Sequence, residues 1–201
     1  MGKVSAGATM SLDGYIAGPD DTGFDLLFKW YGAGEVEVPM PYAGTTVPAS
    51  RVSPATAELL RKEMAGWGAL VVGRHLYDFT NAWGGRHPLD VPTVVLTHRP
   101  PDDRPQSDEN FVFVTEGIEA AVARAKEIAG DGNVAVNGGQ MARQALAAGL
   151  LDEIGIDLVP VILGAGTPLF ADLGHHPMEL EGPILLIEGT GVTHLRYRVI
   201  K

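Results

Sequence analysis

The amino-acid sequence predicts an α/β domain with a mostly parallel central sheet that ends in an antiparallel hairpin. Short apolar runs alternate with helical patterns along most of the chain, and the last two apolar runs flank a Glu-Gly-Thr-Gly turn at residues 188–191. Strands that alternate with helices pair in parallel, whereas two strands joined by a tight turn pair antiparallel. A length of 201 residues suits one compact unit. We therefore expect a single domain over residues 1–201, with a long loop excursion at about residues 20–52.

The first strand is expected at Val4–Met10, where the residues are small and apolar. The Asp-Gly and Gly-Pro pairs within residues 13–19 indicate a loop after it. The excursion holds so many glycines and prolines that we expect only a short helix within it, over Phe24–Trp30. Loops of this length in compact proteins are usually functional or disordered.

A helix begins after Ser53, because serine is a good N-cap and Pro54 suits the first helical position. Gly66 or Gly68 ends it. The elements expected after this helix are strands at Ala69–Val72, Thr93–Thr97, Phe111–Thr115, Val134–Val136 and Ile154–Leu163, helices at Ile118–Ala129 and Gln140–Ala148, and hairpin strands at Ile184–Ile187 and Val192–Ile200.

The overall composition excludes several classes of protein. A net charge of −10 at pH 7 argues against a protein that coats nucleic acid. The chain has no cysteine, so it forms no disulfide, thiolate zinc site or iron–sulfur cluster. It shows neither an apolar run of membrane-spanning length nor a signal-peptide pattern at its start. We expect a cytoplasmic protein that acts on a small molecule and binds neither nucleic acid nor membrane.

Three strand ends carry groups that suit a phosphate. Ligands of such sheets bind beyond the carboxyl ends of the strands. The residues at these ends are Gly73, Arg74 and His75 after one strand, Thr97, His98 and Arg99 after another, and Asn137, Gly138, Gly139 and Gln140 before a helix. Guanidinium groups and the free N–H groups of a helix N-terminus both attract phosphate oxygens. The pattern predicts a site for a phosphate-bearing ligand at one edge of the sheet.

Other motifs are incomplete. Gly164-Ala165-Gly166 supplies the first part of a dinucleotide-binding fingerprint, but no third glycine follows in place. No serine lies in a nucleophile elbow, so a hydrolase is not supported. His175 and His176 are adjacent, their side chains would point apart on an extended chain, and no carboxylate completes a ligand set, so we expect no metal site.

The order of these segments resembles the dihydrofolate reductase-like superfamily. The most diagnostic segments are Ser11–Ala17 and Leu158–Phe170, supported by Val-Val-Gly-Arg-His, Val-Val-Leu-Thr-His-Arg-Pro and Val-Asn-Gly-Gly-Gln. Within the superfamily, the chain is most similar to the reductase domain of the bacterial riboflavin deaminase–reductase and its stand-alone relatives. The resemblance covers nearly the whole chain except residues 20–52 and roughly 171–183. It implies the three-layer fold of that superfamily.

The resemblance also implies a reductase that uses NADPH to transfer a hydride to a C=N or C=O group of a pterin-like or ribosylaminopyrimidine-like substrate. By position, Gly73, Arg74 and His75 would lie along the cofactor phosphates, and Thr97, His98 and Arg99 around the adenosine ribose and its extra phosphate. Gly138, Gly139 and Gln140 would receive the pyrophosphate, and the loop from Leu12 to Ala17 would cover the nicotinamide. Relatives commonly have a third glycine where this chain has Asn137, which tolerates unusual backbone angles. Relatives also pair through sheet edges, which implies a homodimer.

The proton donor of such a reaction is open at this stage, because hydride transfer also requires a proton source. Asp157, a single carboxylate in an apolar strand, faces either solvent or a hairpin partner, or it faces the pocket and binds or protonates substrate. Asp13 either shapes a turn or contacts substrate, and Tyr15 either stacks on a ring or packs. Asp25 is a further candidate, and Arg86 or His87 could reach an anionic substrate or a neighbouring subunit. A non-catalytic nucleotide-binding paralogue and a flavin-binding protein remain alternatives.

Overall fold

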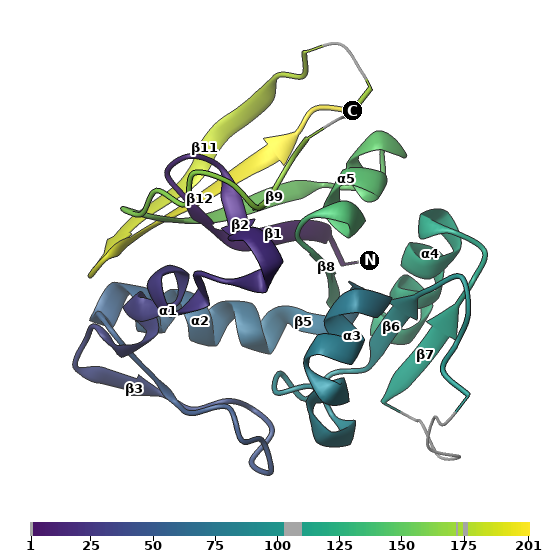
Figure 1. Cartoon of the computed structure of the whole chain (residues 1–201), viewed down its shortest axis with the longest axis horizontal. Helices are drawn as coiled ribbons and strands as arrows, with labels where there is room; N and C mark the ends of the chain where they lie inside the picture. Colours follow the sequence, from purple (N-terminus) through teal and green to yellow (C-terminus); the bar gives the residue numbers. More distant parts are fainter. Residues whose placement is uncertain (1, 103–109, 172, 175–176) are drawn as a thin grey trace.

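The computed structural model describes residues 2–102, 110–171, 173–174 and 177–201 (Figure 1). Within these residues, an eight-stranded sheet has the order β11-β12-β9-β1-β8-β5-β6-β7. The strands from β9 to β7 in this order pair in parallel. Strand β12 is antiparallel to β9, and β11 is antiparallel to β12. The predicted α/β class, parallel sheet and terminal hairpin are confirmed.

Each strand of this sheet lies where the apolar runs predict it. The strands are β1 (Val4–Ser11), β5 (Trp67–Gly73), β6 (Thr93–Leu96), β7 (Phe111–Val114), β8 (Asn133–Asn137), β9 (Glu153–Val159), β11 (Leu180–Gly189) and β12 (Val192–Val199). The expected extension of β9 to Leu163 is wrong, because the strand ends at Val159. Pro160 comes next and has no N–H group to donate to a neighbouring strand.

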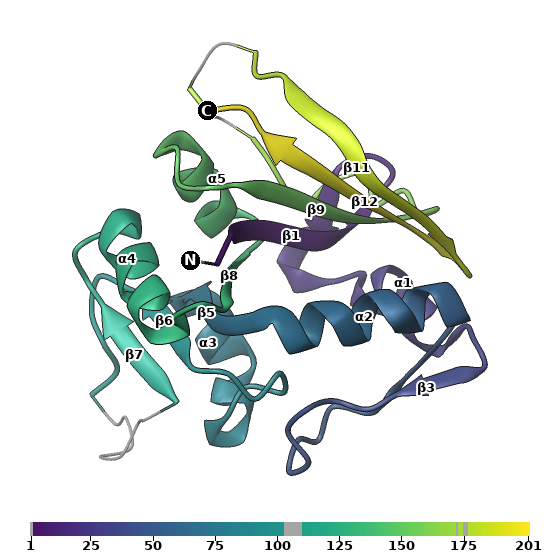
Figure 2. The ribbon, with the colours of Figure 1, turned by 180° about the vertical axis from the view of Figure 1, so that it is seen from behind.

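Helices lie on both faces of the sheet (Figures 1 and 2). On one face, α4 (Ile118–Ala129) and α5 (Gln140–Ala147) bury alanines and other apolar side chains against β1, β8 and β5. On the other face, α3 (Arg74–Phe79) packs Tyr77 against β5 and β6, and α2 (Pro54–Gly66) contacts β11 and β12. The Ser53 hydroxyl accepts a hydrogen bond from the Thr56 amide, as expected of an N-cap. The outcome is a three-layer domain.

The excursion at residues 20–52 is more ordered than its glycines and prolines suggest. It contains α1 (Phe24–Leu27), a 3-10 turn at Lys29–Gly32, and the strands β3 (Val36–Val38) and β4 (Ser50–Val52), which pair antiparallel. Its apolar side chains form a second core with Ala57 of α2. Two three-residue strands carry too little periodicity to be recognised from sequence. The excursion is therefore a packed unit and not a plain surface loop.

A small two-stranded sheet joins two segments that are far apart in the sequence. Strand β2 (Tyr15–Ala17) pairs with β10 (Thr167–Pro168), which brings the two most diagnostic segments side by side. A side chain at Gly166 would collide with the Ala17 carbonyl oxygen, at 2.0 Å, so only glycine allows this approach. None of the helices in the described part of the chain has the length and apolar character needed to span a bilayer.

Candidate active site

A cavity of about 1540 Å³ is lined by residues of α2, α3 and α5 and of the strands between them. This volume exceeds the roughly 300–1,000 Å³ of a typical small-molecule pocket, so it can hold a dinucleotide and a second molecule together. The predicted site residues that line it are Ala17, Gly73, Arg74, His75, Thr97, His98, Arg99, Asn137, Gly138, Gly139, Gln140 and Asp157. The structure thus brings the three strand ends to one cavity.

A hydrogen bond from Arg74 joins the end of β5 to the end of β6, where Thr97 makes a local bond to the same acceptor. Arg74 Nη1 and Thr97 Oγ1 both donate to the Arg99 carbonyl oxygen, at 2.8 Å and 2.9 Å. Arg74 Nε also donates to both Asp78 oxygens at 2.8 Å. These contacts hold the Arg74 guanidinium at the cavity wall. The Arg99 side chain is 80% exposed and pairs with Asp102, so its guanidinium lies at the mouth of the cavity.

The turn after β8 presents backbone N–H groups to the cavity. Gly139 is the N-cap of α5, and no side chain caps the first N–H groups of that helix. A side chain at Gly138 would come within 3.0 Å of the Ala8 Cβ and 3.1 Å of the Ile16 Cδ1. The unusual backbone angle lies at Gly139, with φ of +70°, and Asn137 remains in its strand. The position that requires positive φ is thus occupied by glycine, and the turn does not depend on the tolerance of Asn137 for unusual backbone angles.

Asp13 and Tyr15 are not among the lining residues. The Asp13 carboxylate accepts hydrogen bonds from Ser11 Oγ at 2.6 Å and from the backbone amides of Leu163 and Gly164 at 3.1 Å and 2.7 Å. The Ser11 hydroxyl and these amides lower the pKa of Asp13 below its ordinary value. This geometry supports the turn-shaping alternative for Asp13. It gives no support to a substrate contact by Asp13 or Tyr15.

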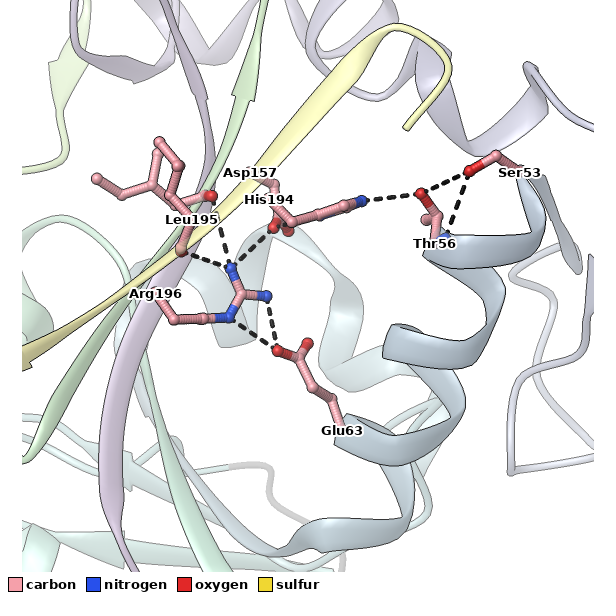
Figure 3. A network of polar contacts seen from close by, with 8 residues as sticks. Ser53, Thr56, Glu63, Asp157, His194, Leu195 and Arg196 are labelled. Atoms are coloured by element: carbon pink, nitrogen blue, oxygen red, sulfur yellow. Dashed lines mark hydrogen bonds and ion pairs between the residues drawn. The ribbon is translucent and has the colours of Figure 1, made fainter. Parts of the chain in front are cut away.

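A cluster of polar side chains lies at the other end of the cavity, between α2, β9 and β12 (Figure 3). Asp157 Oδ1 accepts from His194 Nδ1 at 2.8 Å and from Arg196 Nη1 at 3.1 Å. Glu63 Oε1 accepts from Arg196 Nε at 2.8 Å and from Arg196 Nη2 at 2.7 Å. His194 is fully buried, and its Nε2 lies 3.0 Å from Thr56 Oγ1. Asp157 therefore contacts His194 on the hairpin strand β12 and also lines the cavity.

The two carboxylates of this cluster have opposite pKa shifts. Burial opposes ionisation of Asp157, but the His194 hydrogen bond and the positive charge of Arg196 outweigh it and lower the pKa. For Glu63, burial is the larger effect, so the pKa is raised in spite of Arg196. Burial also opposes the charged form of Arg196, yet Asp157 and Glu63 raise its pKa. Oppositely shifted carboxyl groups in one cavity are typical of sites that transfer protons.

Aromatic rings form one wall of the cavity. The Phe24 ring stacks on Phe28 at 5.7 Å and contacts Phe79 at 5.8 Å between centroids. Phe28 and Phe79 are 43% and 55% exposed, so a flat ligand could cover them. Asp25 is exposed and is not a lining residue, so the structure does not place it with this wall.

The two candidate residues of the loop at residues 83–88 lie in different surroundings. Arg86 pairs with Asp90 and lies over the Tyr42 ring, whereas His87 lines the cavity. Burial lowers the pKa of His87 to about 4. Its Nδ1 accepts a hydrogen bond from the Leu89 amide, so the neutral ring carries its proton on Nε2. His87 is thus an uncharged donor, not a cation for an anionic substrate.

Sequence reasoning missed Glu63, His194, Arg196 and Thr56. The alternation of β12 places His194 and Arg196 on one face of the strand, which is a usable signal. Nothing local indicates that this face meets α2 and β9. His175 and His176 lie outside the described residues, and the remaining described side chains include no group of three potential metal ligands.

The fold is that of an α/β protein of the dihydrofolate reductase class. The structure of dihydrofolate reductase from Enterococcus faecalis, complexed with NADP(H) and RAB-propyl, superposes with a TM-score of 0.54 at 16% identity, over 99% of this chain and 97% of the other. A putative riboflavin biosynthesis protein from Shewanella sp. PV-4 superposes with a TM-score of 0.69 at 23% identity, over 99% of both chains. At these identities the likeness shows the fold, and the predicted dihydrofolate reductase-like fold is confirmed.

The sequence model of the RibD C-terminal domain matches residues 2–191, so the chain belongs to that family. The family is one of reductases, which places the chain in an oxidoreductase family. A Bacillus subtilis relative, the uncharacterized protein YwjB, is 29% identical over 104 residues. That match spans 52% of this chain and 59% of the relative's length.

Proposed function

We propose that this protein is an NADPH-dependent reductase that transfers a hydride to a C=N or C=O group of a small heterocycle, such as a pterin or a ribosylaminopyrimidine. One observation carries the proposal. A single cavity joins a phosphate-binding edge, built from Arg74, Arg99 and the N-terminus of α5, to a wall of aromatic rings and carboxylates. Such a cavity can hold a nucleotide at one end and a reducible ring at the other.

The residues at the strand ends fit the cofactor. The uncapped N-terminus of α5 would bind the pyrophosphate, and the absence of a side chain at Gly138 lets this turn pack closely against Ala8 and Ile16. Arg74 would bind the phosphates, and Thr97, His98 and Arg99 would surround the adenosine ribose and its phosphate. When bound, NADPH supplies the hydride. The protein has to position the acceptor and exclude water, which the half-exposed rings of Phe28 and Phe79 would do.

A homodimer is part of this proposal. Strand β11 is an edge of the sheet, and its Ile184 and Leu186 side chains are 41% and 56% exposed. An edge strand with exposed apolar side chains favours pairing with another chain. Light scattering should give a particle of twice the 21.3 kDa chain mass, and a particle of one chain mass would contradict the dimer.

The test is a parallel titration of the protein with NADPH and NADH, repeated for Arg74→Ala and Arg99→Ala. We expect tighter binding of NADPH, and Arg99→Ala should weaken NADPH more than NADH by about 1–3 kcal/mol, the contribution of a charged hydrogen bond. Arg74→Ala should weaken both nucleotides, because both carry the pyrophosphate. Arg124→Ala is the control, because Arg124 pairs with Glu127 on α4, away from the cavity. An equal loss for both nucleotides in Arg99→Ala, or no loss in Arg74→Ala, would contradict the assigned roles of the arginines.

Two further measurements separate the alternatives. NADPH binding without oxidation by any of a panel of dihydropterins and ribosylaminopyrimidines would favour a non-catalytic nucleotide-binding protein. Flavin absorbance bands in the purified protein would favour a flavin-binding protein, and a colourless protein that oxidises NADPH would exclude it.

A further inference from the structure

Two carboxylates at the cavity wall share one arginine, and each uses only one of its oxygens (Figure 3). Glu63 Oε1 accepts both hydrogen bonds from Arg196, and Asp157 Oδ1 accepts those from Arg196 and His194. Glu63 Oε2 and Asp157 Oδ2 have no hydrogen-bond partner among the described residues. Because both side chains line the cavity, a bound molecule can reach these two oxygens.

The charges of this cluster do not balance when both carboxylates are ionised. One guanidinium then faces two negative charges, so a proton on one carboxylate is favoured. Asp157 has an additional donor in His194, whereas Glu63 has only Arg196. Glu63 is therefore the carboxylate that takes up a proton first as the pH falls, and Asp157 is the one that stays ionised to lower pH.

Other charged or titratable groups around Glu63 do not reverse this assignment. Arg196 and His194 face it from β12, Asp157 from β9 and Tyr31 from the 3-10 turn at Lys29–Gly32. The Tyr31 hydroxyl is buried beside both carboxylates, and burial with their negative charges raises its pKa, so it carries no charge. Lys62, also a lining residue, is the neighbour of Glu63 on α2.

We propose that Glu63 donates the proton that the reduced substrate needs, and that Asp157 is the ionised group that holds an N–H of the substrate beside it. This inference deepens the proposed reductase function and depends on it. It also assigns to Asp157 the binding role, of the two roles that the sequence leaves open.

The step balances without a further reagent. The C=N (or C=O) π bond of the substrate breaks, its carbon receives the hydride of the dihydronicotinamide, and its nitrogen or oxygen receives the proton from Glu63 Oε2. Glu63 is left as a carboxylate, which Arg196 already contacts through Oε1. A proton from water then restores the acid. The substrate gains two electrons and two hydrogens, and the oxidised nicotinamide leaves.

The first test needs neither cofactor nor substrate. A pH titration of chain labelled with ¹³C at the glutamate and aspartate carboxyl carbons is followed by NMR for the wild type, Glu63→Gln and Asp157→Asn. The glutamate signal that disappears in Glu63→Gln should titrate above the ordinary glutamate value of about 4.3, and the aspartate signal lost in Asp157→Asn below about 3.9. Glu58→Gln, an exposed position on the same helix, is the control and should remove neither signal. A Glu63 signal that titrates at or below the ordinary value would overturn the proposal.

The second test uses turnover with the acceptors of the panel above. Glu63→Gln should lower kcat by about 10²–10⁴-fold with little change in KM, which is the range for loss of a general acid, and it should remove the alkaline decline of the rate. Asp157→Asn should chiefly raise KM, and Glu58→Gln should match the wild type. Wild-type kcat and pH profile in Glu63→Gln would refute the donor role. A wild type that binds no NADPH would refute the reductase function, and the carboxyl titration would still decide which carboxylate holds the proton.

Discussion

The cavity has a strand-end side, formed by the residues after β5, β6 and β8, and a carboxylate end, formed by Glu63, Asp157 and their partner Arg196. The two regions differ in how far apart in the sequence their contacting residues lie. At the strand-end side, Arg74 and the Arg99 carbonyl oxygen are only 25 positions apart, and each belongs to a short motif directly after a strand. At the carboxylate side, Glu63 contacts Arg196 across 133 positions, and Thr56 contacts His194 across 138. Parallel strands align their ends by topology alone, so local motifs predict the first region. The second depends on where one helix crosses the sheet.

The largest expected effect concerns the carboxylate end. Arg196→Met removes the guanidinium shared by Glu63 and Asp157 and leaves the Asp157 carboxylate, which is only 18% exposed, without that cation, which should lower the free energy of unfolding by about 3–5 kcal/mol. Urea denaturation at pH 7 measures this loss. Arg198→Met is the matched control on the same strand: its side chain is 53% exposed and pairs with Glu181, so the loss should stay below about 1 kcal/mol. Equal losses of unfolding free energy in the two variants would show that Arg196 stabilises the fold no more than an exposed ion pair does.

A smaller effect is expected at the strand-end side. Gly139 has φ of +70° and ψ of −133°, a conformation open to glycine alone. Gly139→Ala should therefore lower the free energy of unfolding by about 1–3 kcal/mol and weaken NADPH binding, because the turn that opens α5 would change. Calorimetric unfolding and the NADPH titration measure the two effects. Gly130→Ala, also at positive φ but after α4 and away from the cavity, should weaken stability without changing NADPH binding.

The smallest effect is a pH dependence at His87, which also lines the cavity. Its pKa of about 4 in the folded chain lies below the ordinary 6.5, so the unfolded chain takes up this proton first as the pH falls. The stability that the neutral His87 ring contributes is fully present above pH 6.5 and declines as the pH falls toward 4. His87→Gln should remove this part of the decline, which unfolding curves at pH 7 and pH 5 would reveal. A decline of the same size in the variant would assign the titration to other groups.

The sequence predicts regular elements and conspicuous residues, but it does not predict very short strands or contacts between distant segments. The helix at Ile118–Ala129 is predicted to the residue, because its apolar period is regular and glycines flank it. The paired strands at 36–38 and 50–52 are not predicted, because three residues carry no readable period. Asp157 is found because a lone carboxylate in an apolar strand is conspicuous. Glu63 is not found, because a glutamate on a helix is ordinary until its partner strand is known.

The packed excursion has a consequence for how such a chain can change over generations. Trp30 stacks on Tyr31 at 3.9 Å and meets the edge of the His194 ring at 5.3 Å, so these two residues pack at the carboxylate end, whereas Asp21 pairs with His75 after β5. Mutations that remodel residues 30–52 would reshape the cavity near the carboxylates and leave the Asp21–His75 pair and the proposed nucleotide-binding residues in place. In this way, one fold could keep its proposed coenzyme site while the substrate that it reduces changes.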